Sequence, residues 1–164
     1  MEMKPIGIIH SPFQAASGVP IQPAFATDTE GSVEVAPEYA EALADLDGFE
    51  RIWLLYWFDR AAPFKAQVKP YLDNQTHGLF ATRAPARPNP IGLSCVKLLS
   101  VEGTTLNVGS IDILDGTPLL DIKPYASRFD RFDVTRNGWL DTAQKGSTRA
   151  DDRFFETPGQ GTTQ

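Results

Sequence analysis

Residues 91–114 read Ile-Gly-Leu-Ser-Cys-Val-Lys-Leu-Leu-Ser-Val-Glu-Gly-Thr-Thr-Leu-Asn-Val-Gly-Ser-Ile-Asp-Ile-Leu, and they decide the fold class. Two apolar-rich runs, 91–101 and 105–114, stand on either side of Glu102-Gly103. Apolar and polar residues alternate in the second run, as is typical of a strand with one buried face. A glycine turn between two such runs predicts a β-hairpin.

Further strands are predicted on both sides of this hairpin, and only residues 37–47 predict a helix. The strand-like runs are residues 6–10, 32–36, 49–58, 78–82 and 119–124. The run 49–58 is apolar and aromatic throughout, which predicts a strand buried on both faces. Strands outnumber helices by roughly six to one without a βαβ rhythm, so we expect a mainly β fold, a small antiparallel β-barrel with one or two short helices.

The chain length and the change in composition near its end indicate how it is organised. A chain of 164 residues predicts one domain with a sizeable core. We expect residues 1–140 to form the barrel domain and residues 141–164 to form a polar C-terminal tail. The last part of this tail, residues 156–164, is expected to be disordered because it is polar and rich in Gly and Thr.

Composition excludes several classes of protein. The net charge of −6 weighs against a broad basic surface for nucleic acid, although it leaves room for a local basic patch. The single cysteine, Cys95, rules out an intrachain disulfide and a multi-cysteine zinc site, and we expect no metal. The sequence has neither an apolar run of membrane-spanning length nor a signal-peptide pattern, so we expect a cytoplasmic protein with no membrane partner.

The segment Arg83-Ala-Pro-Ala-Arg-Pro-Asn-Pro90 predicts a stiff binding loop. Proline fixes φ and biases the preceding residue toward extended geometry, so Arg83, Arg87 and Asn89 are held at set angles. One interpretation pairs the arginines with acids of neighbouring turns, such as Asp112 or Asp115. The interpretation that we favour has them bind a carboxylate or phosphate, which matches the planar guanidinium fork.

Three acids form a second candidate group near the turn at residues 112–118. Asp115 precedes a glycine, a pair that favours turns, while Asp112 and Asp121 lie close by in sequence. These carboxylates would either shape the turn or accept a proton and orient an amine. Lys123 and Tyr125 add a cation and a phenol to the group, or simply end a strand.

Five segments of the chain, taken in order, resemble the TsaA-like (TrmO) family. They are Ile6-Gly-Ile-Ile-His-Ser-Pro-Phe13, Asp47-Gly-Phe-Glu-Arg-Ile-Trp53, Gly78-Leu-Phe-Ala-Thr-Arg83, Arg87-Pro-Asn-Pro-Ile-Gly-Leu-Ser94, and Asp112-Ile-Leu-Asp-Gly-Thr-Pro118 with Asp121-Ile-Lys-Pro-Tyr125. The Arg-Pro-Asn-Pro-Ile-Gly block followed by Asp-Gly-Thr-Pro is the most specific part of the resemblance.

The resemblance implies a tRNA methyltransferase that uses S-adenosyl-L-methionine. It implies methylation of N6 of threonylcarbamoyl-adenosine at tRNA position 37, on a β-barrel that is unlike the Rossmann-type methyltransferases and that forms homodimers. Two alternatives stay open. The same fold and cofactor would serve another RNA or a small-molecule acceptor, or the chain would be a non-catalytic S-adenosyl-L-methionine-binding module.

The resemblance also implies roles for individual residues, matched motif by motif. The cofactor-binding set comprises Pro23, Ala24, Phe25, Asp59, Arg60, Arg83, Leu93, Ser110, Ile111 and Asp112. The substrate-binding set comprises Arg87, Asn89 and Lys123, with Arg87 facing tRNA phosphate or bracing its own loop. The catalytic set comprises Asp115, Asp121 and Tyr125, as candidate proton acceptors.

Overall fold

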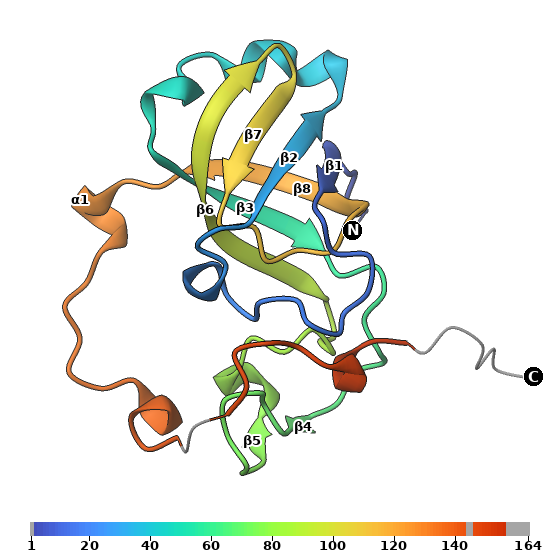
Figure 1. Ribbon diagram of the computed structural model, residues 1–164, viewed down its shortest axis with the longest axis vertical. Helices are drawn as coiled ribbons and strands as arrows, with labels where there is room; N and C mark the ends of the chain where they lie inside the picture. The colour runs from blue at the N-terminus through green and yellow to red at the C-terminus, as the bar shows by residue number, and fades with distance from the viewer. Residues whose placement is uncertain (1, 144–145, 157–164) are drawn as a thin grey trace, which may run out of the picture.

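The computed structural model describes residues 2–143 and 146–156, and its centre is a closed six-stranded antiparallel barrel (Figure 1). Around the barrel the strands follow the order β1-β2-β7-β6-β3-β8. Their bounds are β1 Gly7–His10, β2 Glu30–Val35, β3 Arg51–Trp57, β6 Ile91–Glu102, β7 Thr105–Gly109 and β8 Thr117–Pro124. The predicted mainly β, antiparallel barrel is therefore confirmed.

The hairpin predicted from residues 91–114 is the pair β6–β7, but its second strand ends at Gly109 and not at residue 114, because Ser110 has φ of 61° and leaves the extended conformation. Gly103 occupies its turn with φ of 62°, a left-handed conformation that glycine adopts without strain. The register shifts between Leu98 and Ser100, and this irregularity lets the long strand β6 bend between its two neighbours. β6 pairs with β3 along its first half and with β7 along its second half, so it joins two sides of the barrel.

The core fills the barrel interior and is built by strict alternation. In β3 the side chains of Ile52, Leu54 and Tyr56 point inward and are buried, whereas Trp53 and Trp57 point outward and are half-buried. The prediction that this strand is buried on both faces is wrong. A closed barrel has a single interior, so its outer face stays partly exposed even where the sequence is apolar throughout.

Two local predictions are also wrong. Residues 37–47 form two short 3-10 helices, η2 (Pro37–Leu43) and η3 (Leu46–Gly48), because Asp45 between them has φ of 65° and breaks the helix. Residues 78–82 do not form one strand. They divide into β5 (His77–Gly78), which pairs with β4 (Gln67–Val68), and the 3-10 helix η4 (Leu79–Ala81).

A second apolar cluster lies beside the barrel, in the part of Figure 1 that holds β4 and β5. Its buried members are Val68, Leu79, Ala84, Ala86 and Phe154. Phe154 belongs to η6 (Asp152–Phe154) in the predicted polar tail, and it is only 3% exposed. Residues 146–156 of that tail thus pack back onto the protein, while nearly all of the predicted disorder, over 156–164, lies outside the described residues.

The remaining short helices lie in the connection between β1 and β2 and in the segment after β8. They are η1 (Pro23–Phe25), α1 (Ser127–Asp130) and η5 (Gly138–Asp141). η1 packs against β6 on the outer wall of the barrel. It consists of Pro23, Ala24 and Phe25, three residues that the resemblance assigned to the cofactor-binding set.

Candidate functional site

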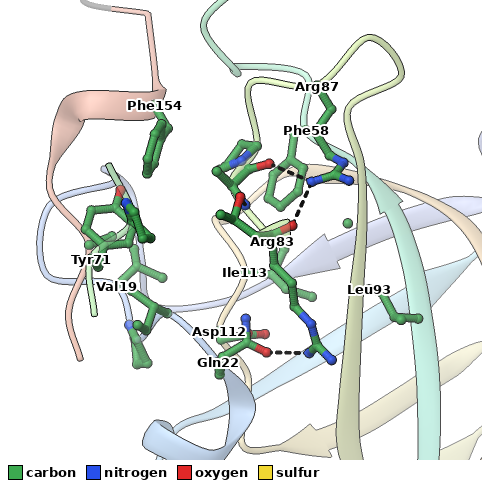
Figure 2. A pocket seen from close by; sticks show the side chains of 18 of the residues that line it. Val19, Gln22, Phe58, Tyr71, Arg83, Arg87, Leu93, Asp112, Ile113 and Phe154 are labelled. Atoms are coloured by element: carbon green, nitrogen blue, oxygen red, sulfur yellow. Dashed lines mark hydrogen bonds between the residues drawn. The ribbon is translucent and has the colours of Figure 1, made fainter. Parts of the chain in front are cut away.

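The barrel and the second cluster enclose a pocket of about 810 Å³, which we call the main pocket. Its volume is within the range of about 300–1,000 Å³ that is typical of small-molecule sites. On the side of the barrel its wall includes Phe58, Leu93, Asp112 and Ile113, and on the side of the second cluster it includes Tyr71 and Phe154 (Figure 2). Tyr56 and Ala84 also line the pocket. Most of the lining is apolar, with a few polar groups that face the same space.

The two arginines of the proline-rich loop both line the main pocket, but they make different contacts. Nη1 of Arg83 donates a hydrogen bond to Oε1 of Gln22 at 2.7 Å, so the guanidinium bridges the loop and η1 (Figure 2). Nη1 of Arg87 donates to the carbonyl of Thr82 at 3.0 Å, which braces its own loop. Among the described residues neither arginine pairs with a carboxylate, so the ion-pair interpretation is wrong.

Asp112 is the most perturbed carboxyl group of the main pocket. Its Oδ1 accepts a hydrogen bond from Oγ of Ser94 at 2.7 Å, and Oη of Tyr56 lies 3.1 Å from the same serine oxygen. Burial raises the pKa of Asp112 to about 7, although the hydrogen bond from Ser94 and the charge of Arg83 both act to lower it. Asp112 is therefore poised to gain or lose a proton near neutral pH.

The structure gathers most of the predicted cofactor-binding residues around this pocket. Its lining includes Ala24, Phe25, Asp59, Arg60, Arg83, Leu93 and Asp112. Pro23 and Ser110 instead line an adjoining smaller pocket, and Ile111 is fully buried in the barrel core. Arg60 already donates from Nη2 to the carbonyl of Asp115 at 2.8 Å and to Oγ1 of Thr117 at 3.1 Å, so one edge of its guanidinium is engaged.

The predicted catalytic residues do not come together. The Asp115 carboxylate accepts hydrogen bonds from the Ser11 amide and from the Gln14 side chain, and it lines neither pocket. These contacts hold the pKa of Asp115 below its ordinary value. Asp121 forms an ion pair with Lys123 on the outer side of β8, at 2.7 Å. Tyr125 lines the smaller pocket.

The predicted substrate-binding residues are also separated. Arg87 faces the main pocket, while Asn89 lies on the exposed tip of the proline-rich loop. Lys123 lies opposite Trp53 in the pairing of β3 with β8, with its ammonium paired to Asp121. No single surface of the described structure unites the three residues.

Sequence reasoning missed three residues that complete the site. Tyr56 and Ser94 were hidden in apolar runs, although a serine at an inward position of an alternating strand signals a buried polar contact. Gln22, the partner of Arg83, lies in a loop without periodicity, and its role depends on a contact across 61 residues of sequence.

Two features are absent from the described part of the chain, a group of metal ligands and a membrane-spanning helix. Over residues 2–143 and 146–156, no three His, Cys, Asp or Glu side chains lie close enough together to hold a metal ion. None of the helices in those ranges has the length and apolar character needed to span a membrane.

Comparison with known proteins identifies the family. Residues 8–131 match the family described as the tRNA-methyltransferase O N-terminal domain. The chain belongs to this family. The TrmO family match covers all of the barrel strands except Gly7, the first residue of β1, and it includes Arg83 and Asp112 of the main pocket. The resemblance inferred from the five sequence segments is thereby confirmed.

Individual relatives show how far the similarity extends. A probable S-adenosyl-L-methionine-binding protein of Pyrococcus abyssi is 52% identical over 154 residues, which cover 93% of this chain and 84% of that protein. The tRNA (adenine(37)-N6)-methyltransferase of Mus musculus is 38% identical over 77% of this chain, but the alignment covers only 31% of the mouse protein. The crystal structure of TrmO from Pseudomonas aeruginosa superposes with a TM-score of 0.71 at 39% identity, over 84% of this chain and 62% of that one.

Proposed function

We propose that this TrmO-family chain is an S-adenosyl-L-methionine-dependent methyltransferase that methylates N6 of threonylcarbamoyl-adenosine at tRNA position 37. The main pocket is the observation that carries the proposal, because an anion-binding guanidinium and a carboxyl group of raised pKa face one apolar space. The names of the Pyrococcus and mouse relatives support the cofactor and the tRNA substrate, respectively.

The residues of the main pocket fit S-adenosyl-L-methionine. Arg83 uses one of its five N–H donors in the hydrogen bond to Gln22, so other donors are available for the carboxylate of the cofactor. Phe58, Leu93 and Ile113 offer an apolar wall for its adenine. The Asp112 carboxylate provides a negative charge to complement its sulfonium. When bound, the cofactor supplies a methyl group that is already activated for transfer.

The residues of the chain would contribute alignment and proton transfer. Arg83 belongs to the proline-rich loop and donates a hydrogen bond to Gln22, the N-cap of η1, and an anchor positioned in this way favours an in-line arrangement of reacting groups. We propose Asp112 as the group that accepts the proton lost from N6, since an acceptor works best when its pKa is close to neutral. Ser94 and Tyr56 would position its carboxylate through their hydrogen bonds.

The catalytic roles of Asp115, Asp121 and Tyr125 remain predictions. Wild-type turnover in both Asp115→Asn and Asp121→Asn would remove the two acids from the mechanism. Tyr125 lines the smaller pocket together with Arg83, which lines both pockets.

The test is transfer of labelled methyl from S-adenosyl-L-methionine to bulk tRNA from a strain that lacks the activity. We expect label in tRNA, and mass analysis should find it on N6 of the modified adenosine at position 37. Calorimetry of cofactor binding should show weaker affinity for Arg83→Gln and wild-type affinity for Arg128→Gln, an exposed arginine outside both pockets.

A second candidate keeps the fold and the cofactor but changes the role. The net charge of −6 permits an acceptor other than tRNA, either another RNA or a small molecule. The name of the Pyrococcus relative is consistent with a non-catalytic binding module. Label found only in small molecules would support the first alternative, and tight cofactor binding with no transfer would support the second.

We also propose that the protein is a homodimer. Exposed apolar side chains on the outer face of the barrel support this, among them Leu99 on β6, which is 50% exposed. Sedimentation velocity should give the mass of a dimer for the wild type and that of a monomer for Leu99→Asp. Wild-type protein that sediments as a monomer at all concentrations would contradict the proposal.

A further inference from the structure

A smaller pocket of about 540 Å³ lies on the outer face of β3 and β6, next to the main pocket. It shares Gln22, Ala24 and Arg83 with the main pocket, so the two spaces meet at the Arg83 side chain. Its distinctive lining consists of two aromatic residues, Trp53 and Tyr125, and two further cations, Arg51 and Lys97. The roles discussed so far leave Trp53, Arg51 and Lys97 unassigned.

Strand register explains why these side chains meet. Arg51 lies opposite Lys97, and Trp53 lies opposite Cys95, in the antiparallel pair β3–β6. Alternation then points all four outward, since the residues between them fill the barrel core. The chain brings Tyr125 to the same face after β8, where its amide donates to the carbonyl of Arg51 at 3.1 Å. The rings of Trp53 and Tyr125 are 5.9 Å apart and tilted by 57°.

The pocket carries positive charge although the whole chain is acidic. Its lining includes three cations and no carboxylate, against a net charge of −6 for the protein. Asp130 is the acid that acts on neighbouring Cys95, and its Oδ2 already accepts the Ala126 amide at 2.8 Å. Burial raises the pKa of the Cys95 thiol, so the thiol stays neutral at physiological pH and adds no negative charge to the pocket.

This combination matches the chemistry of an unpaired nucleotide. Aromatic side chains stack with bases of any sequence, and nearby cations neutralise the backbone phosphate. We propose that the smaller pocket binds one unpaired nucleotide of an RNA substrate, with its base against Trp53 and Tyr125 and its phosphate at Arg51 and Lys97. The inference rests on the proposed function and deepens it, because it says where the anticodon loop enters the site.

The lining of the pocket and its border with the main pocket favour a nucleotide over an acidic peptide as its ligand. A peptide carboxylate would use the cations but has no planar ring for the Trp53–Tyr125 wall. A nucleotide uses both, and a base held here would lie beside Arg83, at the border of the main pocket. Binding of this kind also explains how an acidic protein would hold tRNA through a local patch rather than a broad basic surface.

The first experiment measures the affinity of an unstructured oligoribonucleotide of about eight nucleotides for variants of the full chain. Trp53→Ala should weaken binding about 5- to 150-fold, the usual effect of removing one base-stacking side chain. Arg51→Gln with Lys97→Gln should lower the slope of log affinity against log salt by about 0.7 for each phosphate that the variant no longer neutralises.

Matched controls separate these contacts from general effects. Trp57→Ala removes another outward tryptophan of β3 that lines neither pocket, and it should leave RNA affinity unchanged. Lys4→Gln removes an exposed lysine paired with Glu38 and should change neither affinity nor salt slope. Thermal melting of every variant checks that the barrel is folded, and sedimentation velocity checks that its assembly state is that of the wild type.

Cys95 supplies an independent readout, because it is the only cysteine and it lines the smaller pocket. The oligoribonucleotide should slow the alkylation of Cys95 by iodoacetamide in the wild type, and this protection should be lost in folded Trp53→Ala. An acidic peptide of equal charge should protect poorly. Equal protection by the peptide would overturn the inference in favour of a protein partner.

The outcomes distinguish the inference from the function on which it rests. If wild type and Trp53→Ala methylate tRNA with the same KM and bind RNA equally, the proposed nucleotide site is wrong and the proposed methyltransferase activity is supported. If RNA protects Cys95 and Trp53→Ala weakens RNA binding, but no tRNA accepts a methyl group, the proposed methyltransferase activity is wrong and the proposed nucleotide site is supported. A change in assembly state that accounts for the whole loss of RNA affinity would also overturn the site.

Discussion

Replacing Asp112 with asparagine should change how the stability of the protein depends on pH. Burial raises the pKa of this carboxyl group from an ordinary 3.8 to about 7, which means that the folded state disfavours its charged form. The contribution of Asp112 to the stability of the wild type is therefore undiminished below about pH 4. It falls as pH rises between about 4 and 7, while the unfolded chain gives up the proton more readily than the folded one.

The size of the effect follows from the two pKa values. One pKa unit is worth about 1.36 kcal/mol, so the full cost of holding the charge in the pocket approaches about 4 kcal/mol at high pH. Between about pH 5 and pH 8 the expected change is about 3 kcal/mol. Part of the surface of Asp112 is accessible to solvent, so solvent screening reduces the expected change in the free energy of unfolding to about 1.5–3 kcal/mol.

Urea unfolding at about pH 5 and about pH 8, for the wild type and Asp112→Asn, measures this quantity. Other titrating groups are the same in both proteins, so the difference between their unfolding free energies isolates position 112. Asparagine should gain about 1.5–3 kcal/mol relative to aspartate over this range. A difference that stays constant with pH would refute the argument that burial raises the pKa of Asp112.

Two further substitutions probe the same network and its support. Ser94→Ala removes the hydrogen bond that favours the Asp112 carboxylate, so the pKa of Asp112 should rise further, and a carboxyl NMR titration should show it; an unchanged midpoint would contradict this. Gly92→Ala would place a methyl group inside the Tyr56 ring, so it should lower the free energy of unfolding in urea by about 1–3 kcal/mol. As a control, the new methyl group of Gly48→Ala meets open space and should change the free energy of unfolding by no more than about 0.5 kcal/mol. Equal effects of the two substitutions would contradict the close packing of Gly92 against Tyr56.

The sequence predicts those features of the fold that depend on neighbours along the chain. Alternation and the Glu102-Gly103 turn specify β6 and β7, because a hairpin closes over a few residues. Residues 78–82 show the limit of such reasoning. Their apolar character is typical of a strand, but the carbonyl of Leu79 accepts the Thr82 amide in a short 3-10 turn, and Leu79 packs into the second cluster.

For the site too, the sequence predicts residues that belong to local motifs but not the contacts between distant segments. Motif resemblance located Arg83, Leu93 and Asp112, which the structure brings to one pocket. It could not show that the Asp115 carboxylate is engaged by Ser11, a partner 104 residues away in the sequence. Hydrogen bonds between distant segments depend on barrel closure, and no local pattern encodes them.

The pairing of β1 with β8 has a consequence for synthesis on the ribosome. Gly7 pairs with Leu119, so the partner of β1 on that side is translated about a hundred residues later. At about 5–20 residues per second, the nascent chain exposes one edge of β1 for about 5–20 seconds. An unpaired edge is a template for pairing with the wrong chain, so slow translation or a crowded polysome should favour aggregation until β8 emerges.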